Sequence, residues 1–166
     1  MSIHGIRSAY LFTGVMRKAI HEFKYRGVFS LAPLLSHLLV EYLSSSGIRA
    51  DVIVPVPLHR HRLKERGYDQ AELLVRYLAG EANLFLGKDW LIRVRATPPQ
   101  VKTASAAERW QNMLGAFTAG AGVERGSSVL LVDDVCTTGA TLEACAIALR
   151  EAGVVRVWGL TLAREP

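Results

Sequence analysis

The sequence predicts an α/β fold in which a mainly parallel central sheet is flanked by helices. Residues 128–132, Ser-Val-Leu-Leu-Val, are almost continuously apolar, as expected for a parallel strand that is covered on both faces. A helical pattern at 142–152, a stop at Gly153 and a strand pattern at 154–162 follow and complete a β-α-β unit. Strand and helix patterns also alternate from about residue 48 onward, which is typical of domains with a parallel sheet.

The first third of the chain is predicted to form an N-terminal helical appendage, at about residues 1–47. Apolar residues at helical spacing predict one helix near 15–23 and a second helix at 31–42. The basic turn 24–27, Lys-Tyr-Arg-Gly, separates the two helices. The remaining residues, about 48–166, are expected to form the α/β core.

Within this core, the pattern predicts a short buried strand at 51–54 and a helix that runs from its N-cap Asp69 to about Gly80. The apolar face of that helix is expected to hold Leu73, Leu74, Tyr77 and Leu78. Another strand is expected at 91–94. The polar stretch that follows it, 95–108, is too long for an ordinary connection, and loops of this length are commonly lids or binding loops. We therefore expect a mobile loop there.

The composition is that of one globular domain over residues 1–166. Half of the residues are hydrophobic and 21% are charged, which excludes a disordered tail or a coiled rod. The formal net charge of +5 favours an anionic partner, such as nucleic acid, a phosphorylated metabolite or a membrane surface. The two cysteines, Cys136 and Cys145, are too few for a disulfide framework or a four-cysteine zinc site. Because no signal peptide or membrane span is predicted, a cytoplasmic location is expected.

The residues that carry chemistry follow the most apolar strand. Asp133 and Asp134 adjoin a turn of small and hydroxylated residues that opens directly into a helix. Ligands of open parallel sheets bind outside the carboxyl ends of the strands, and free backbone amides at a helix N-terminus favour phosphate. The predicted phosphate-binding residues are Cys136, Thr137, Thr138, Gly139, Ala140 and Thr141. The two carboxylates are expected to face sugar hydroxyls or a phosphate-bridging Mg²⁺.

Other phosphate-binding and acidic motifs are less consistent with this segment. A receiver domain also ends its first strand in paired aspartates, but it needs a lysine further on, and no lysine follows Thr141. A nucleotide P-loop is excluded because Gly-x-x-x-x-Gly-Lys does not occur in the sequence. The glycine-rich run 120–126 precedes a strand instead of following one, so it is interpreted as a linker.

Residues 129–141 resemble the phosphoribosyl pyrophosphate (PRPP) signature of type I phosphoribosyltransferases. Upstream, residues 51–58, 66–71 and 115–117 resemble the ComF family of competence-associated, phosphoribosyltransferase-like proteins, and 24–27 is similar to the Lys-aromatic-x-Gly element of that family. The resemblance implies a type I phosphoribosyltransferase fold. It also implies binding of PRPP with Mg²⁺, and transfer of the phosphoribosyl group to a nitrogen acceptor with release of pyrophosphate.

The resemblance further implies roles for individual residues. Asp133, Asp134 and Arg66 would be catalytic, and the two aspartates would hold Mg²⁺ directly or indirectly. The pyrophosphate would be bound by Val56, Pro57, Leu58 and Lys24. A hood over the reacting centre would contain Gln100, Arg109 and Asn112. Two features depart from the family pattern: the common four-cysteine zinc element is missing, and Asp69 stands where an asparagine is usual.

Three functions stay open from the sequence. The first is a phosphoribosyltransferase, and the second is a regulator that binds PRPP without turnover. The third is a competence protein that assists uptake of single-stranded DNA, as the family's name and the charge of +5 suggest. The aromatic residues, 8% of the chain, do not interleave with the basic run at 59–66, which weakens the DNA hypothesis. A homodimer is also considered.

Overall fold

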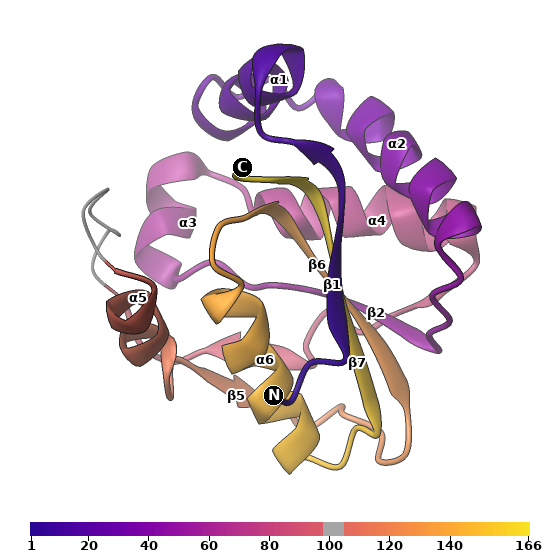
Figure 1. Cartoon of the computed structure of the whole chain (residues 1–166), viewed down its shortest axis with the longest axis vertical. Helices are drawn as coiled ribbons and strands as arrows, with labels where there is room; N and C mark the ends of the chain where they lie inside the picture. Colours follow the sequence, from indigo (N-terminus) through magenta and orange to yellow (C-terminus); the bar gives the residue numbers. More distant parts are fainter. Residues whose placement is uncertain (98–104) are drawn as a thin grey trace.

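The computed structural model describes residues 1–97 and 105–166 (Figure 1). Its centre is a five-stranded sheet with the order β1-β7-β6-β2-β3, in which all neighbouring strands are parallel. These strands are β1 Gly5–Leu11, β2 Val52–Pro55, β3 Phe85–Leu86, β6 Ser128–Cys136 and β7 Arg156–Arg164. A separate antiparallel pair consists of β4 Leu91–Arg93 and β5 Phe117–Ala119. The predicted parallel α/β architecture is therefore confirmed.

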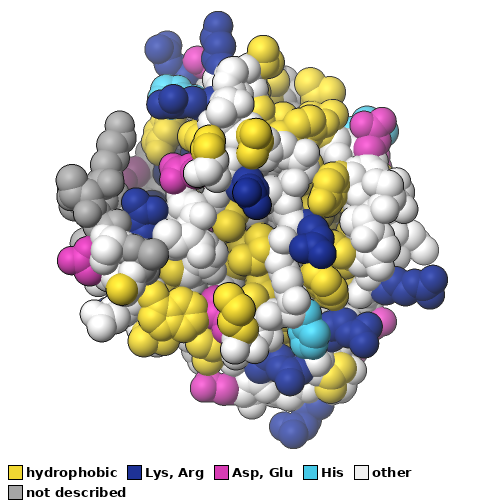
Figure 2. All heavy atoms as spheres, in the orientation of Figure 1, with side chains coloured by type: hydrophobic (Ala, Val, Ile, Leu, Met, Phe, Trp, Pro, Cys, Tyr) yellow, Lys and Arg dark blue, Asp and Glu magenta, His cyan; other side chains and the backbone are white. Residues whose placement is uncertain are grey.

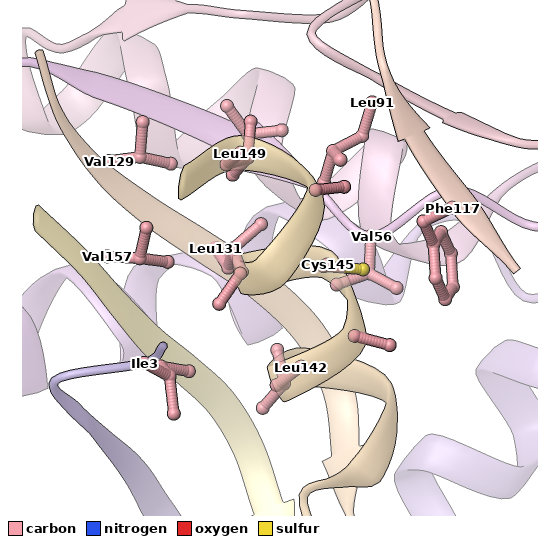
Figure 3. Close-up of a cluster of buried hydrophobic side chains, with 14 of the residues drawn as sticks. Ile3, Val56, Leu91, Phe117, Val129, Leu131, Leu142, Cys145, Leu149 and Val157 are labelled. Carbon is pink, nitrogen blue, oxygen red and sulfur yellow. The ribbon is translucent and has the colours of Figure 1, made fainter. Parts of the chain in front are cut away.

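Helices cover both faces of the central sheet. They are α1 Gly14–Tyr25, α2 Leu31–Ser46, α3 Arg60–Arg66, α4 Gln70–Ala82, α5 Ala106–Met113 and α6 Ala140–Glu151. Buried side chains of α1, α2 and α4 form one hydrophobic cluster with one face of the sheet. On the other face, Leu142, Cys145 and Leu149 of α6 pack against Leu131 and its neighbours (Figure 3).

The apolar strand β6 is buried on both faces because it lies in the middle of this sandwich. Val129 and Leu131 belong to the cluster under α6, whereas Leu130 and Val132 belong to the cluster under α2 and α4. All four side chains are fully buried. Alternating side chains thus face opposite layers, which explains why this strand has no polar alternation in the sequence.

The N-terminal third differs from the predicted helical appendage. Residues 5–11 form β1, which pairs in parallel with β7 at the edge of the central sheet, and α1 and α2 follow it. Ile20 and Phe23 of α1 are fully buried in the same cluster as the sheet residue Leu160. The first third is therefore an integral layer of the domain. An edge strand with no fully buried residue leaves a weak hydrophobic pattern, which is why the sequence did not reveal it.

Three further features differ from the sequence interpretation. The strand near 91–94 exists as β4, but it pairs with β5 outside the central sheet, which ends instead at the short strand β3. In α4, Tyr77 is 43% exposed, because the buried face is shifted to Leu74, Val75 and Leu78. The basic run that begins at Arg60 is the helix α3, which the sequence interpretation did not include.

Among the described residues, no helix is both long and apolar enough to cross a bilayer.

Candidate functional site

The carboxyl ends of the parallel strands meet along one edge of the sheet, and a cavity of about 430 Å³ lies there. Its lining joins residues from β6, the segment after β2, α1, α3 and the start of α6. Among the residues predicted from sequence, the lining includes Lys24, Val56, Pro57, Leu58, Arg66, Asp133, Asp134, Thr137 and Thr141. The topology thus brings together groups that are far apart in the sequence, as expected at the carboxyl edge of an open sheet.

The acid pair lies at the end of β6. Asp134 is only 6% exposed, and its backbone N–H donates to Oδ1 of Asp133 over 2.8 Å. Burial and, next, the nearby Asp134 carboxylate raise the pKa of Asp133 to about 8. Two neighbouring buried carboxyl groups cannot both ionise without a large electrostatic cost. A cation or a hydrogen-bonding ligand is therefore needed to stabilise the ionised pair.

That cation is Lys24, which comes from the last turn of α1. Its Nζ lies 2.8 Å from Oδ1 of Asp134, and the two side chains are 20% and 9% exposed. Burial opposes the charged ammonium, but the attraction and hydrogen bond of Asp134 outweigh it, so the pKa of Lys24 is raised. The lysine is therefore charged when it meets the acid pair.

The segment after the acid pair forms an open turn at the N-terminus of α6. Gly139 is the N-cap residue and has φ +80°, a conformation that glycine adopts without steric cost. A Cβ at this position would lie 2.8 Å from Cδ1 of Ile6, which is the end of a flexible side chain that can move aside, so the positive φ is the main reason for a glycine here. The side chains of Thr137 and Thr138 are exposed, and the backbone N–H of Ala140 points to Oγ1 of Thr138 over 3.4 Å. This arrangement suits an anion.

The helix α3 brings basic side chains to the mouth of the cavity. His59 caps its N-terminus, where the imidazole accepts a hydrogen bond from the backbone of His61, and Gly67 ends it with φ +80°. Arg66 donates to Oε1 of Gln70 over 2.9 Å, and its guanidinium lies 5.2 Å from the ring centroid of Tyr25. These contacts fix Arg66 in the lining of the cavity.

Comparison with known proteins agrees with this geometry. Residues 66–166 match the phosphoribosyl transferase domain family. The chain is 35% identical over 155 residues to Competence protein F of Haemophilus influenzae, covering 87% of this chain and 66% of the relative. It is 34% identical over 156 residues to DNA utilization protein YhgH of Salmonella typhimurium strain LT2, covering 90% of this chain and 68% of the relative.

The chain belongs to the ComF family of phosphoribosyltransferase-like proteins. Competence protein ComFC of Bacillus subtilis is 31% identical over 164 residues, and the match covers 96% of this chain and 64% of that protein. The chain therefore spans about two thirds of the length of these relatives.

Solved structures place the fold of this ComF-family chain among the type I phosphoribosyltransferases. The glutamine PRPP amidotransferase from B. subtilis, solved with ADP and GMP, is similar with a TM-score of 0.55 and 26% identity. That match covers 81% of this chain and 26% of the amidotransferase chain. A second structure, described as the allosteric regulatory enzyme of purine biosynthesis, has a TM-score of 0.50 and 24% identity, again over 81% of this chain and 26% of the other.

The hood residues implied by the ComF resemblance have different positions. Gln100 lies outside the described residues. Arg109 and Asn112 are half-buried on α5, which begins with a capping box between Ser105 and Glu108. The residue of α5 in the lining of the cavity is Met113. Among the described residues, Arg109 and Asn112 are thus not brought to the acid pair in this structure.

Several cavity residues were missed by the sequence interpretation. Gln70 is 2% exposed, lines the cavity, and its Nε2 has no hydrogen-bond partner among the described residues. Arg93 also lines the cavity, and its Nε is likewise buried and unpartnered within the described part of the chain. Burial and the nearby Arg62 lower the pKa of Arg93. These groups are donors without acceptors, so they favour an anionic ligand. Gln70 lies in the segment 66–71 that resembles the ComF family, which is the signal that could have found it, whereas no local pattern marks Arg93.

Asp69 connects the segment after β2 to helix α4. One carboxylate oxygen accepts from the backbone N–H of Leu58 over 2.9 Å, and the other accepts from Glu72 over 3.0 Å. We expect Asp69→Ala to lower the free energy of unfolding by about 1 kcal/mol through the lost cap, and to weaken ligand binding by releasing Leu58. Urea unfolding and calorimetry would measure the two effects. Asp51→Ala is the control, because its carboxylate accepts from the backbone N–H of Ser128 over 2.8 Å at the other end of the sheet. It should lower stability without weakening binding, and equal binding losses in both variants would contradict the role assigned to Asp69.

A second cavity, of about 490 Å³, adjoins the turn and is lined by Cys136, Thr137, Thr138, Arg7 and Arg164 among others. Burial raises the pKa of the Cys136 thiol, which disfavours a reactive thiolate. Arg164 ends β7 beside Cys136, and it makes no ion pair with an acidic side chain within residues 1–97 and 105–166. The sequence interpretation missed this cation, which reaches the turn only through the pairing of β6 and β7.

We expect Arg164→Gln to weaken binding of ribose 5-phosphate about tenfold, because a charged donor beside the turn would be lost. Calorimetry at fixed salt would measure the affinity. The control is Arg156→Gln, which changes an exposed arginine at the opposite end of the same strand and should have no effect. An Arg164 variant that binds like the unmodified protein would show that the guanidinium does not contact the phosphate.

Proposed function

We propose that the protein binds PRPP at the carboxyl edge of the sheet and transfers the phosphoribosyl group to a nitrogen acceptor, with release of pyrophosphate. The observation that supports this most is the direct connection of a buried acid pair to an open turn at a helix N-terminus, inside one cavity with unpartnered donors. The turn would bind the 5′-phosphate, the acid pair would accept hydrogen bonds from the ribose hydroxyls, and the basic side chains would bind the pyrophosphate.

In the proposed reaction, the bond between C1 of the ribose and the pyrophosphate oxygen breaks, and its electron pair leaves with the pyrophosphate. The acceptor nitrogen forms the new bond to C1 and loses a proton to solvent. Asp133 and Asp134 would hold the ribose hydroxyls, Lys24 would neutralise Asp134, and Arg66 would stabilise the departing anion. No side chain needs to act as a covalent nucleophile.

Magnesium, which the family resemblance implies, does not fit a direct place on the acid pair. Oδ1 of Asp134 already contacts the Lys24 ammonium at 2.8 Å, and the described residues contain no group of three acidic, histidine or cysteine side chains that could hold a metal. Proteins commonly bind Mg²⁺ through few carboxylates together with substrate phosphates. We therefore propose that any Mg²⁺ is bound by the pyrophosphate of the ligand.

Calorimetry with PRPP tests the binding step. We expect micromolar affinity in the presence of Mg²⁺, and loss of binding in the double variant Asp133→Asn/Asp134→Asn. Undiminished binding in that variant would contradict the site. Pyrophosphate release across a panel of nucleobases and amines tests the transfer step, and binding without release for any acceptor would favour a regulator that binds PRPP without turnover.

A second candidate function is the handling of single-stranded DNA, which the names Competence protein F and DNA utilization protein of the relatives favour. On the face drawn in Figure 2, Lys and Arg side chains are spread between hydrophobic side chains and do not form one continuous stripe. Fluorescence anisotropy with a labelled oligonucleotide at several salt concentrations tests this function, because phosphate contacts give a steep salt dependence. We also propose that the protein is cytoplasmic and that it forms a homodimer. Light scattering would test the homodimer.

A further inference from the structure

The ion pair between Lys24 and Asp134 is built into the fold and does not depend on a flexible surface contact. Ile20 and Phe23 fix helix α1 in the core, and Tyr68 donates a hydrogen bond to the carbonyl of Phe23. The lysine therefore extends from a firmly placed helix end toward the edge of the sheet. Its ammonium also lies at the C-terminal end of α1, where the helix dipole favours positive charge.

The ammonium occupies Oδ1 of Asp134, one of the carboxylate oxygens that a metal ion at the acid pair would need. Mg²⁺ requires oxygen ligands at about 2.0–2.1 Å in octahedral geometry, and it releases its water reluctantly. A second cation at the same carboxylate oxygen would be repelled strongly at this depth, because the surroundings screen charges poorly. Lys24 satisfies the acid pair with one positive charge that is covalently tethered, so metal binding would first require removal of the lysine.

We propose that the Lys24 ammonium is the cation that balances the acid pair and that it prevents divalent metal ions from binding there. The ribose hydroxyls would therefore contact a carboxylate-ammonium pair instead of a metal ion. This inference deepens the proposed function and rests on it for the identity of the ribose ligand. The exclusion of metal from the ligand-free protein does not depend on that ligand.

Binding of the ribose 5-phosphate part of the ligand and binding of its pyrophosphate part should differ in their dependence on Mg²⁺. Ribose 5-phosphate has no pyrophosphate to chelate Mg²⁺, so its affinity should be equal with Mg²⁺ and with EDTA. PRPP carries the metal on its pyrophosphate, so its affinity should increase with Mg²⁺. If Lys24 is removed, the acid pair should accept a divalent ion, and metal dependence should then appear for ribose 5-phosphate as well.

Titration of the ligand-free protein with Mn²⁺, followed by electron paramagnetic resonance, tests the exclusion of metal. We expect no saturable binding in the millimolar range for the unmodified protein and for Lys24→Arg. Lys24→Met should bind Mn²⁺ at least about tenfold more tightly, and adding Asp134→Asn to this variant should abolish the gain. Lys18→Met, which changes an exposed lysine of the same helix, is the matched control and should behave like the unmodified protein.

Two results would overturn the inference: saturable Mn²⁺ binding to the unmodified protein that Asp134→Asn abolishes, or a folded Lys24→Met variant that binds Mn²⁺ no better than the unmodified protein. Circular dichroism would establish folding, and Lys24→Gln, whose amide still donates a hydrogen bond, replaces Lys24→Met if that variant does not fold. Absence of ribose 5-phosphate binding to the unmodified protein would contradict the proposed function alone, because the Mn²⁺ titration is independent of that ligand.

Discussion

Gly139→Ala is expected to abolish detectable binding of ribose 5-phosphate and to lower the free energy of unfolding by about 1–2 kcal/mol. The backbone at this position has φ +80°, which a residue with a Cβ adopts only at a steric cost. The added Cβ would also lie 2.8 Å from Cδ1 of Ile6 in β1, but this is the end of a side chain that can move aside, so the backbone conformation sets most of the cost. Since Gly139 is the N-cap of α6, relief of the backbone strain would displace the amides of the turn that we propose to bind the phosphate. Calorimetry and urea unfolding would measure the two effects.

Gly126→Ala is the matched control for this variant. Gly126 has φ +85°, close to that of Gly139, but a Cβ there would have no neighbour within 4 Å. It also precedes β6, whereas Gly139 follows it, so the two positions lie at opposite ends of the strand. We expect a similar loss of stability with intact ligand binding. If both variants lost binding equally, the effect would come from general destabilisation and not from the turn.

The parts of the fold that were predictable from sequence depend on local signals. The strand β6 has a continuous apolar run, and the segment 129–141 resembles the PRPP signature of type I phosphoribosyltransferases. The N-cap Asp69 was also confirmed, because its side chain accepts from the backbone of Glu72. The burial of β6 comes from helices that are distant in the sequence, but its unbroken apolar run is visible locally, and the Asp69 cap joins residues only three apart.

The parts that were not predictable depend on long-range packing. The strand β1 exists because β7 offers an edge, and the helix α3 has no buried residue that could give a periodic pattern. The ion pair of Lys24 with Asp134 joins residues that are far apart in the sequence. No residue near Lys24 in the sequence indicates which acidic side chain it contacts. Gln70 is an ordinary helix residue until the fold places its amide in the cavity.

The acid pair should make the ligand-free protein less stable as the pH rises. The folded-state pKa of Asp133 is about 8, above the ordinary value of 3.8, because of burial and the adjacent Asp134. Between these values the folded state keeps a proton that the unfolded state has lost. The contribution of this proton is therefore present at low pH and decreases as the pH rises through this range toward 8.

Asp133→Asn should remove this slope, because an amide keeps the shape of the carboxyl group without its titration. At pH 8 we expect the melting temperature of the variant to exceed that of the unmodified protein by a few degrees, and at pH 5 the difference should become small. Circular dichroism melting curves from pH 5 to pH 9 would measure it. Asp89→Asn, at an exposed turn, is the control and should leave the slope unchanged. A variant with the same slope as the unmodified protein would show that Asp133 does not titrate in this range.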